Sequence, residues 1–207
     1  MSKRTIVIAS NNKNKIKEIK AILPDFKVLS LEDAGIESNP EETEMTFEGN
    51  ALLKAKDAKK HTDYMVIADD SGLEVMCLNN LPGVYSKRFY TYEGTEKNKR
   101  NLTSSSIDKL NNKKLLRLMY KVKQENRNAR FVSKIALIKE DDSYVIFSGE
   151  CNGRILFEPK GRRGFGYDPI FMPDESNITF AEMNEEQKNK ISHRAAALMK
   201  LKEYLND

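Results

Sequence analysis

The chain has 207 residues, of which 39% are hydrophobic and 32% charged, and 35 basic against 31 acidic residues give a net charge of +4. These values predict one soluble globular domain, residues 1–207, with a sizeable core. The mild charge permits an anionic substrate without demanding a nucleic-acid polymer. Two cysteines, Cys77 and Cys151, are too few for a disulfide scaffold. No apolar run is long enough for a signal peptide or a membrane span, so we expect a cytoplasmic protein.

The first third of the chain predicts alternating strands and helices. Residues 4–10 are a short β-branched apolar run, typical of a strand buried on both faces. A helix with apolar residues at helical spacing follows, and Pro24 ends it. Residues 27–30 are expected to form a second strand. Thr46 is expected to cap a helix with alanines four residues apart, and residues 64–68 to form the next strand.

The rest of the chain predicts mostly antiparallel structure. The expected elements are a strand at 73–77, a turn at 81–83, a basic segment from residue 95, a hairpin of strands 129–139 and 144–151, a strand at 154–157, a glycine-rich loop at 161–166 and an amphipathic helix at 191–205. The first part of the basic segment is expected to be a loop or a frayed helix, and its second half, as far as residue 122, a helix. Parallel units at the start and a hairpin later predict a mixed α/β sheet with flanking helices.

Two adjacent carboxylates, Asp69 and Asp70, follow the apolar run 64–68 and precede Ser71 and Gly72. We expect this segment to be a strand end followed by a Ser-Gly turn, where α/β sheets present chemistry. Two carboxylates there can hold Mg²⁺ against a phosphate. The alternative is an acidic turn that closes a hairpin.

A polar segment between the first strand and the first helix can bind an anion. Its residues are Ser10, Asn11, Asn12, Lys13, Asn14 and Lys15. Backbone N–H groups at a helix N-terminus, the helix dipole and two lysines favour phosphate there. The glycines of a Walker loop are absent. An Asn-rich helix cap with solvated lysines is the equally weighted alternative.

Three further groups are candidates only in combination. Glu41 and Glu42 complete a metal site only if the fold brings them to Asp69 and Asp70. Phe165, between Gly164 and Gly166, suits stacking on a base, although a core Phe in a tight turn is the simpler alternative. The third group, Lys188, Ser192, His193 and Arg194, precedes or opens the last helix. A Ser–His–Asp triad is disfavoured because no nucleophile elbow accompanies it.

Taken together, these segments resemble the inosine triphosphate pyrophosphatase family. The matching segments, in the family's order, are residues 10–15, 41–43, 46–51 with Lys54 and Ala55, 68–73, 82–86 with Arg88, 164–171, and Lys188 with 192–194. They cover essentially the whole chain. The resemblance implies an elongated mixed α/β fold with two lobes around a nucleotide cleft, a homodimer, and Mg²⁺-dependent hydrolysis of non-standard purine nucleoside triphosphates (ITP, dITP, XTP) to the monophosphate and pyrophosphate.

The resemblance also implies a role for each matching residue. Asp70 would be the general base and a metal ligand, with Asp69 and either Glu41 or Glu42 beside it. Residues 10–15, Lys54 and Ser71 would hold the phosphates. The base and sugar would be held by Phe165, Gly166, Tyr167, Asp168, Lys188, His193 and Arg194.

The sequence departs from the family pattern at residues 87–89, and the basic segment 95–114 is longer than usual. The sequence fits two other functions less well. Maf-type nucleotide pyrophosphatases share the fold, but their Ser-Pro-Arg-Arg phosphate loop is absent here. A non-catalytic nucleic-acid-binding protein would use the basic stretch 97–117, which lacks interleaved aromatic residues and would bind with a steep salt dependence.

Overall fold

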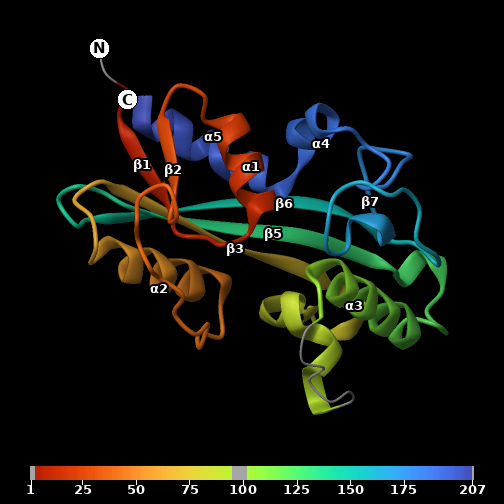
Figure 1. Ribbon diagram of the computed structural model, residues 1–207. Helices are drawn as coiled ribbons and strands as arrows, with labels where there is room; N and C mark the ends of the chain where they lie inside the picture. Colours follow the sequence, from red (N-terminus) through yellow and green to blue (C-terminus); the bar gives the residue numbers. More distant parts are fainter. Residues whose placement is uncertain (1–2, 95–101, 207) are drawn as a thin grey trace. The chain divides into compact units, whose positions relative to one another are not determined.

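A computed structural model describes residues 3–94 and 102–206 of the chain (Figure 1). Its main elements are β1 (Thr5–Ile8), α1 (Lys13–Ile22), β2 (Lys27–Ser30), α2 (Phe47–Lys59), β3 (Met65–Val75), β4 (Leu81–Pro82), α3 (Ser104–Leu118), β5 (Asn128–Ile138), β6 (Tyr144–Ile155), β7 (Phe171–Pro173), α4 (Glu185–Ile191) and α5 (His193–Asn206). A run of 3₁₀ turns, η2, covers Gly83–Gly94.

The strands form a mixed sheet in the order β2-β1-β3-β5-β6-β7, with β4 on β3. β1 is parallel to both β2 and β3, whereas β4 is antiparallel to β3 and β7 antiparallel to β6. β5 and β6 are neighbours joined by the tight turn 139–143, which confirms the predicted hairpin. The mixed α/β sheet predicted from the sequence is therefore confirmed.

The chain divides into two compact units. Unit 1 comprises residues 1–71, 133–150 and 192–207, and unit 2 comprises residues 72–132 and 151–191. In unit 1, helices α1 and α5 cover one face of the strands and α2 covers the other (Figure 1). In unit 2, α3 packs on a core that includes Phe131, Phe171 and Phe180.

Strand alternation explains the two cores of unit 1. In β3, Met65 and Ile67 pack in the cluster that contains α1 and α5, whereas Val66 and Ala68 pack in the cluster that contains α2. Successive side chains of a strand point to opposite faces. The α2 face is built from Ala51, Ala55 and Ala58, all fully buried, so this helix lies close to the sheet. The predicted alanine stripe is confirmed.

The predicted Ser-Gly turn after residues 64–68 is wrong. β3 continues without a break through Asp69, Asp70, Ser71 and Gly72 as far as Val75. Local propensity favours a turn here because Asp, Ser and Gly are poor strand formers, but pairing within the sheet overrides that preference. Similarly, of the separately predicted strand at 154–157, residues 154 and 155 are the end of the longer β6, whereas residues 156 and 157 are not in a strand.

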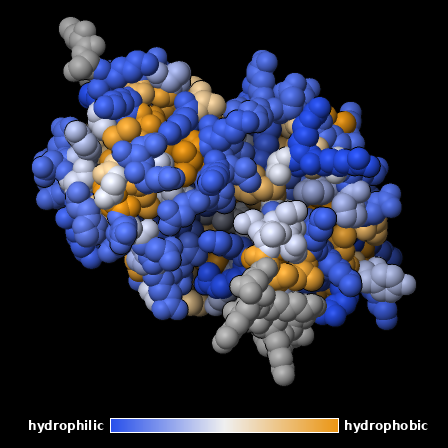
Figure 2. Space-filling model, in the orientation of Figure 1, coloured by the Kyte–Doolittle hydropathy of each residue, from blue (hydrophilic) through white to orange (hydrophobic). Residues whose placement is uncertain are grey.

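The surface drawn in Figure 2 is mostly hydrophilic, with small hydrophobic areas between the charged side chains. Within residues 3–94 and 102–206, no helix is both long enough and apolar enough to span a membrane. The helical part of the basic segment is α3, as expected, whereas residues 95–101, predicted as a loop or a frayed helix, lie outside the described residues.

Candidate functional site

Strand β3 gives its two adjacent carboxylates different partners. By the alternation of the strand, Asp69 belongs to the face covered by α1 and α5, and Asp70 to the face covered by α2. Asp69 accordingly pairs with Lys15 of α1 and Arg194 of α5, and Asp70 pairs with Lys54 of α2. All of these residues belong to unit 1. We call Lys15, Glu18, Glu42, Lys54, Asp69, Asp70 and Arg194 the charged cluster.

Asp69 is enclosed by hydrogen-bond donors and is only 2% exposed. Its Oδ1 accepts from Ser133 Oγ at 2.6 Å, and its Oδ2 lies 2.7 Å from Lys15 Nζ and 3.1 Å from Arg194 Nη2. Ser71 Oγ also donates to Oδ2, at 3.1 Å. Burial alone would raise the pKa of Asp69, but Arg194 and Lys15 outweigh it and hold that pKa well below its usual value.

Asp70 has a different electrostatic environment. Its Oδ1 lies 2.6 Å from Lys54 Nζ, and the same ammonium lies 3.1 Å from Glu42 Oε1. Burial raises the pKa of Asp70, and Lys54 and Lys15 oppose that shift only in part. Burial alone would lower the pKa of Lys54, but Asp70 and Glu42 outweigh it and raise that pKa. Asp70 is thus a buried carboxyl group with increased affinity for a proton, the property that a general base needs.

Two further cations of the cluster are Arg194, which is buried, and Lys15, which is partly buried. Burial lowers the pKa of Lys15, and Asp69 compensates only in part. Arg194 pairs with Glu18 of α1 as well as with Asp69, and Glu18 and Asp69 raise its pKa against the effect of burial. Both lysines also donate to the backbone carbonyl of Asp69, Lys54 at 3.0 Å and Lys15 at 3.4 Å. The ammonium groups of Lys15 and Lys54 therefore contact the same backbone carbonyl of β3.

The polar segment before α1 is a helix cap, as its alternative interpretation states. Asn12 is the N-cap, and its Oδ1 accepts from the backbone N–H groups of Asn14 and Lys15. Ser10 Oγ accepts from the N–H of Asn12. Lys13 and Asn11 are exposed. Lys15, by contrast, is no solvated lysine, because its ammonium pairs with Asp69.

The carboxylates predicted as metal ligands differ in the contacts that they already make. Within the described part of the chain, no three His, Cys, Asp or Glu side chains gather as a ready-made metal site. Glu42 and Asp70 share Lys54, whereas Glu41 is exposed. Both oxygens of Asp69 are occupied by the four donors named above. That Asp69 and Asp70 act side by side on one cation stays a prediction.

A second group of predicted residues lies in unit 2, in the glycine loop, residues 161–168. Asp168 Oδ2 accepts from the backbone N–H of Phe165 at 2.9 Å and lies 2.7 Å from Lys188 Nζ. Lys188 Nζ also lies 4.7 Å from the centre of the Phe165 ring, within range of a cation–π contact. Gly164 has φ +73°, and a Cβ there would lie 2.0 Å from Asp168 Oδ2. Only glycine fits this close approach.

Several predicted base-binding side chains are buried. Tyr167 lies in the core of unit 2, where its hydroxyl donates to the Ser86 carbonyl and burial raises its pKa well above the usual value. Asp168, His193 and Arg194 are at most 4% exposed. Phe165 and Gly166 are partly buried, so they are more accessible than Tyr167 and Asp168.

Sequence reasoning missed Glu18 and Ser133. Glu18 lies three residues after Lys15, which places both on the same side of α1, and this spacing was the available signal. Ser133 is fully buried in the apolar run of β5, so a lone polar residue at a core position was its signal. Neither residue stands out until its partner on another element is known.

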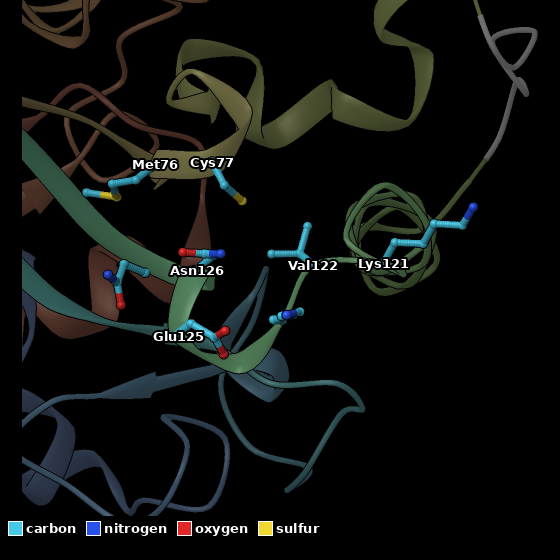
Figure 3. A pocket seen from close by; sticks show the side chains of 8 residues that line it. Met76, Cys77, Lys121, Val122, Glu125 and Asn126 are labelled. Atoms are coloured by element: carbon cyan, nitrogen blue, oxygen red, sulfur yellow. The ribbon is translucent and has the colours of Figure 1, made fainter.

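A surface pocket of about 640 Å³ lies elsewhere in unit 2 (Figure 3). Met76, Cys77, Val122 and Glu125 are among its lining residues. None of the residues that line it belongs to the predicted site. This pocket therefore shares no lining residue with the charged cluster or the glycine loop.

Comparisons with known proteins point to one family. The sequence model of the Ham1 family matches residues 6–204. The chain is 47% identical to a dITP/XTP pyrophosphatase of Haemophilus influenzae (98% of this chain, 100% of the relative) and 45% identical to one of Clostridium tetani (98% and 96%). Among solved structures, the Staphylococcus aureus Ham1 protein is similar with a TM-score of 0.80 at 40% identity, covering 98% of each chain. A HAM1 protein from Coxiella burnetii has a TM-score of 0.82 at 36% identity, again covering 98% of each chain.

Proposed function

The chain belongs to the Ham1 family, and from this we propose that it hydrolyses dITP, XTP and ITP to the monophosphate and pyrophosphate. Its relatives at 43–47% identity are named dITP/XTP pyrophosphatases. We also propose that it acts on free nucleotides of the cytoplasmic pool rather than on a nucleic-acid polymer, and that it works as a homodimer.

The observation that carries this proposal is the charged cluster. It sets three cations, Lys15, Lys54 and Arg194, against four carboxylates, Glu18, Glu42, Asp69 and Asp70. Its formal charge is therefore one negative unit when all seven groups are ionised. A triphosphate would be repelled by such a cluster, so binding requires an additional cation.

Glu42 and Asp70 fit Mg²⁺. This ion is usually held by one or two protein carboxylates together with substrate phosphates and water, so two carboxylates that share one lysine are a sufficient set. When bound, Mg²⁺ would neutralise phosphate charge and acidify a coordinated water. We leave Asp69 out of this set because its oxygens are already occupied.

In this proposal Asp70 accepts the proton of the attacking water at a carboxylate oxygen. Its raised pKa suits that task, and Lys54 at 2.6 Å fixes the orientation of the carboxylate. Lys15 and Lys54 supply positive charge for the phosphate oxygens. Phosphoryl transfer needs mainly positioning and charge neutralisation, so these groups account for most of the chemistry.

We propose that the glycine loop binds the base, with Phe165 as the stacking surface. Hypoxanthine and xanthine present a 6-keto acceptor and an N1 donor, whereas adenine reverses both. A mismatch costs about 1–3 kcal/mol for each buried polar group left unpaired. The resemblance assigns His193 and Arg194 to the base and sugar. The contacts of Arg194 favour instead a role in fixing Asp69 and α1.

A panel of purified nucleoside triphosphates tests the proposal. Each is incubated with and without MgCl₂, and both pyrophosphate and inorganic phosphate are measured. We expect pyrophosphate from dITP, XTP and ITP with Mg²⁺, and much less from ATP and GTP. Release of inorganic phosphate, or equal rates on all purines, would contradict the proposal. Size-exclusion chromatography with light scattering tests the dimer separately.

A further inference from the structure

Two polar side chains of α3 hold the glycine loop from outside. Asp108 Oδ2 accepts from the backbone N–H of Gly166 at 2.8 Å, and Asn112 Nδ2 donates to the carbonyl of Gly166 at 3.0 Å. Residues 108 and 112 are four apart, so they lie on the same side of the helix. The two side chains thus bond the peptide group before Gly166 and the one after it. All three residues belong to unit 2.

Gly166 is the point of the loop where such a restraint matters. Its φ is +61°, a left-handed conformation that favours glycine, although a Cβ there would meet nothing within 4 Å. Glycine can otherwise adopt many conformations, and its neighbours would move with it. Phe165 itself is bonded to Asp168. The carboxylate of Asp168 accepts from the N–H of Phe165, and the backbone N–H of Asp168 donates to the carbonyl of Phe165. The bonds from α3 complete the restraint on both sides of Phe165.

The surroundings of Asn112 and Asp108 indicate that both side chains serve the glycine loop. Asn112 is only 8% exposed, and its Oδ1 has no hydrogen-bond partner among the described residues. Leaving a buried acceptor unsatisfied is unfavourable, so the bond to Gly166 is what Asn112 contributes here. Burial raises the pKa of Asp108, the N–H of Gly166 opposes this, and Asp168 adds to it. The N–H of Gly166 is thus the contact that favours the ionised form of Asp108.

We propose that Asp108 and Asn112 are positioning residues that fix the Gly166 peptides and thereby present Phe165 to the purine base. This inference rests on the proposed function. The two side chains act through the backbone of the loop and not by contact with the substrate. Their loss should therefore weaken substrate binding and leave the hydrolytic step at the charged cluster intact.

The test compares Asp108→Ala, Asp108→Asn and Asn112→Ala with Lys109→Ala, an exposed neighbour on the same helix. With dITP and MgCl₂, Asp108→Ala should raise KM about tenfold, as expected for a lost hydrogen bond to a charged acceptor, and change kcat less than twofold. Asp108→Asn retains an oxygen acceptor and should recover most of the loss. Asn112→Ala should give a smaller rise in KM, and Lys109→Ala none.

Hydrogen–deuterium exchange provides a readout independent of activity. Peptides that cover residues 161–168 should exchange faster in Asp108→Ala and Asn112→Ala than in the wild type and Lys109→Ala. If Asp108→Ala does not fold, Asn112→Ala, which removes only the neutral bond, gives the same comparison. Unchanged exchange, or faster exchange with an unchanged KM, would overturn the inference. A wild type that releases no pyrophosphate from dITP would instead refute the proposed function.

Discussion

The adjacent aspartates of β3 should respond in opposite ways to the same substitution. Asp69→Asn removes a buried negative charge between the buried Arg194 and the partly buried Lys15. Removing one partner of a buried ion pair lowers the free energy of unfolding by about 3–5 kcal/mol, because the other charge is left uncompensated. Arg194 retains Glu18, and Asn retains an acceptor for Ser133, so we expect the lower end, about 3 kcal/mol. For a chain of this size that corresponds to a melting temperature lower by about 6–12 °C.

Asp70→Asn should leave the fold nearly as stable as the wild type. A raised pKa means that the folded protein disfavours the ionised form of Asp70, so a neutral side chain costs little. Lys54 also keeps Glu42 as a partner. Activity should nevertheless be lost, because Asn can neither accept the proton of water nor bring a full charge to Mg²⁺.

Thermal melts followed by circular dichroism, together with pyrophosphate release from dITP, measure both effects. Asp63→Asn, an exposed aspartate, is the matched control and should change neither. If Asp70→Asn melts as low as Asp69→Asn, the assignment of the two side chains to different environments is wrong. A variant Asp70→Asn with near-wild-type turnover would remove Asp70 as the general base.

The dependence of stability on pH provides an independent check on Asp69. Its pKa is lowered on folding, so its stabilising effect is fully present above its usual pKa of 3.8. The effect is lost as the pH falls from that value through the lower pKa of the folded state. The difference in melting temperature between wild type and Asp69→Asn should therefore be constant at neutral pH and shrink in strong acid. A difference that grows in acid would contradict the sign of this argument.

Three further predictions concern the glycine loop and the metal. Phe165→Ala should raise KM for ITP with a smaller change in kcat, since stacking is worth about 1–3 kcal/mol per base; an unchanged KM would identify a purely structural Phe. Gly164→Ala should impair dITP binding more than Gly166→Ala, because both have positive φ but only at Gly164 would the new Cβ strike Asp168; equal KM values would refute this. Chelation by EDTA should abolish pyrophosphate release, and excess MgCl₂ should restore it; activity that survives EDTA would exclude the metal.

The elements that the sequence predicted best depend on local signals. β2 matches the predicted range of residues 27–30, and α2 begins after the predicted cap Thr46, whose hydroxyl accepts from the N–H of Gly49. Caps and alternating apolar patterns act within one or two turns of chain, so they can be recognised without the fold. The turn predicted at Ser71 and Gly72 failed for the converse reason. Propensity is local, whereas the position of a strand is decided by its neighbours in the sheet.

The candidate site was predicted as a set of residues but not as an arrangement. The segments that carry Lys15, Asp70 and Phe165 were recognised by their resemblance to a family. The division of labour between Asp69 and Asp70 could not be recognised, because in the sequence they are equivalent neighbours. Only the alternation of a continuous strand separates them, and a turn at the same place would have set both carboxylates on one corner.

Asp69 shows why the arrangement lies beyond sequence reasoning. Its partners Lys15, Ser133 and Arg194 lie 54, 64 and 125 residues away along the chain. Each alone has an ordinary explanation: a solvated lysine, a strand serine, a basic residue at a helix start. Together they engage both oxygens of the Asp69 carboxylate in contacts within the protein. The pKa of Asp70 is raised instead, because Lys54, which it shares with Glu42, and Lys15 offset its burial only in part.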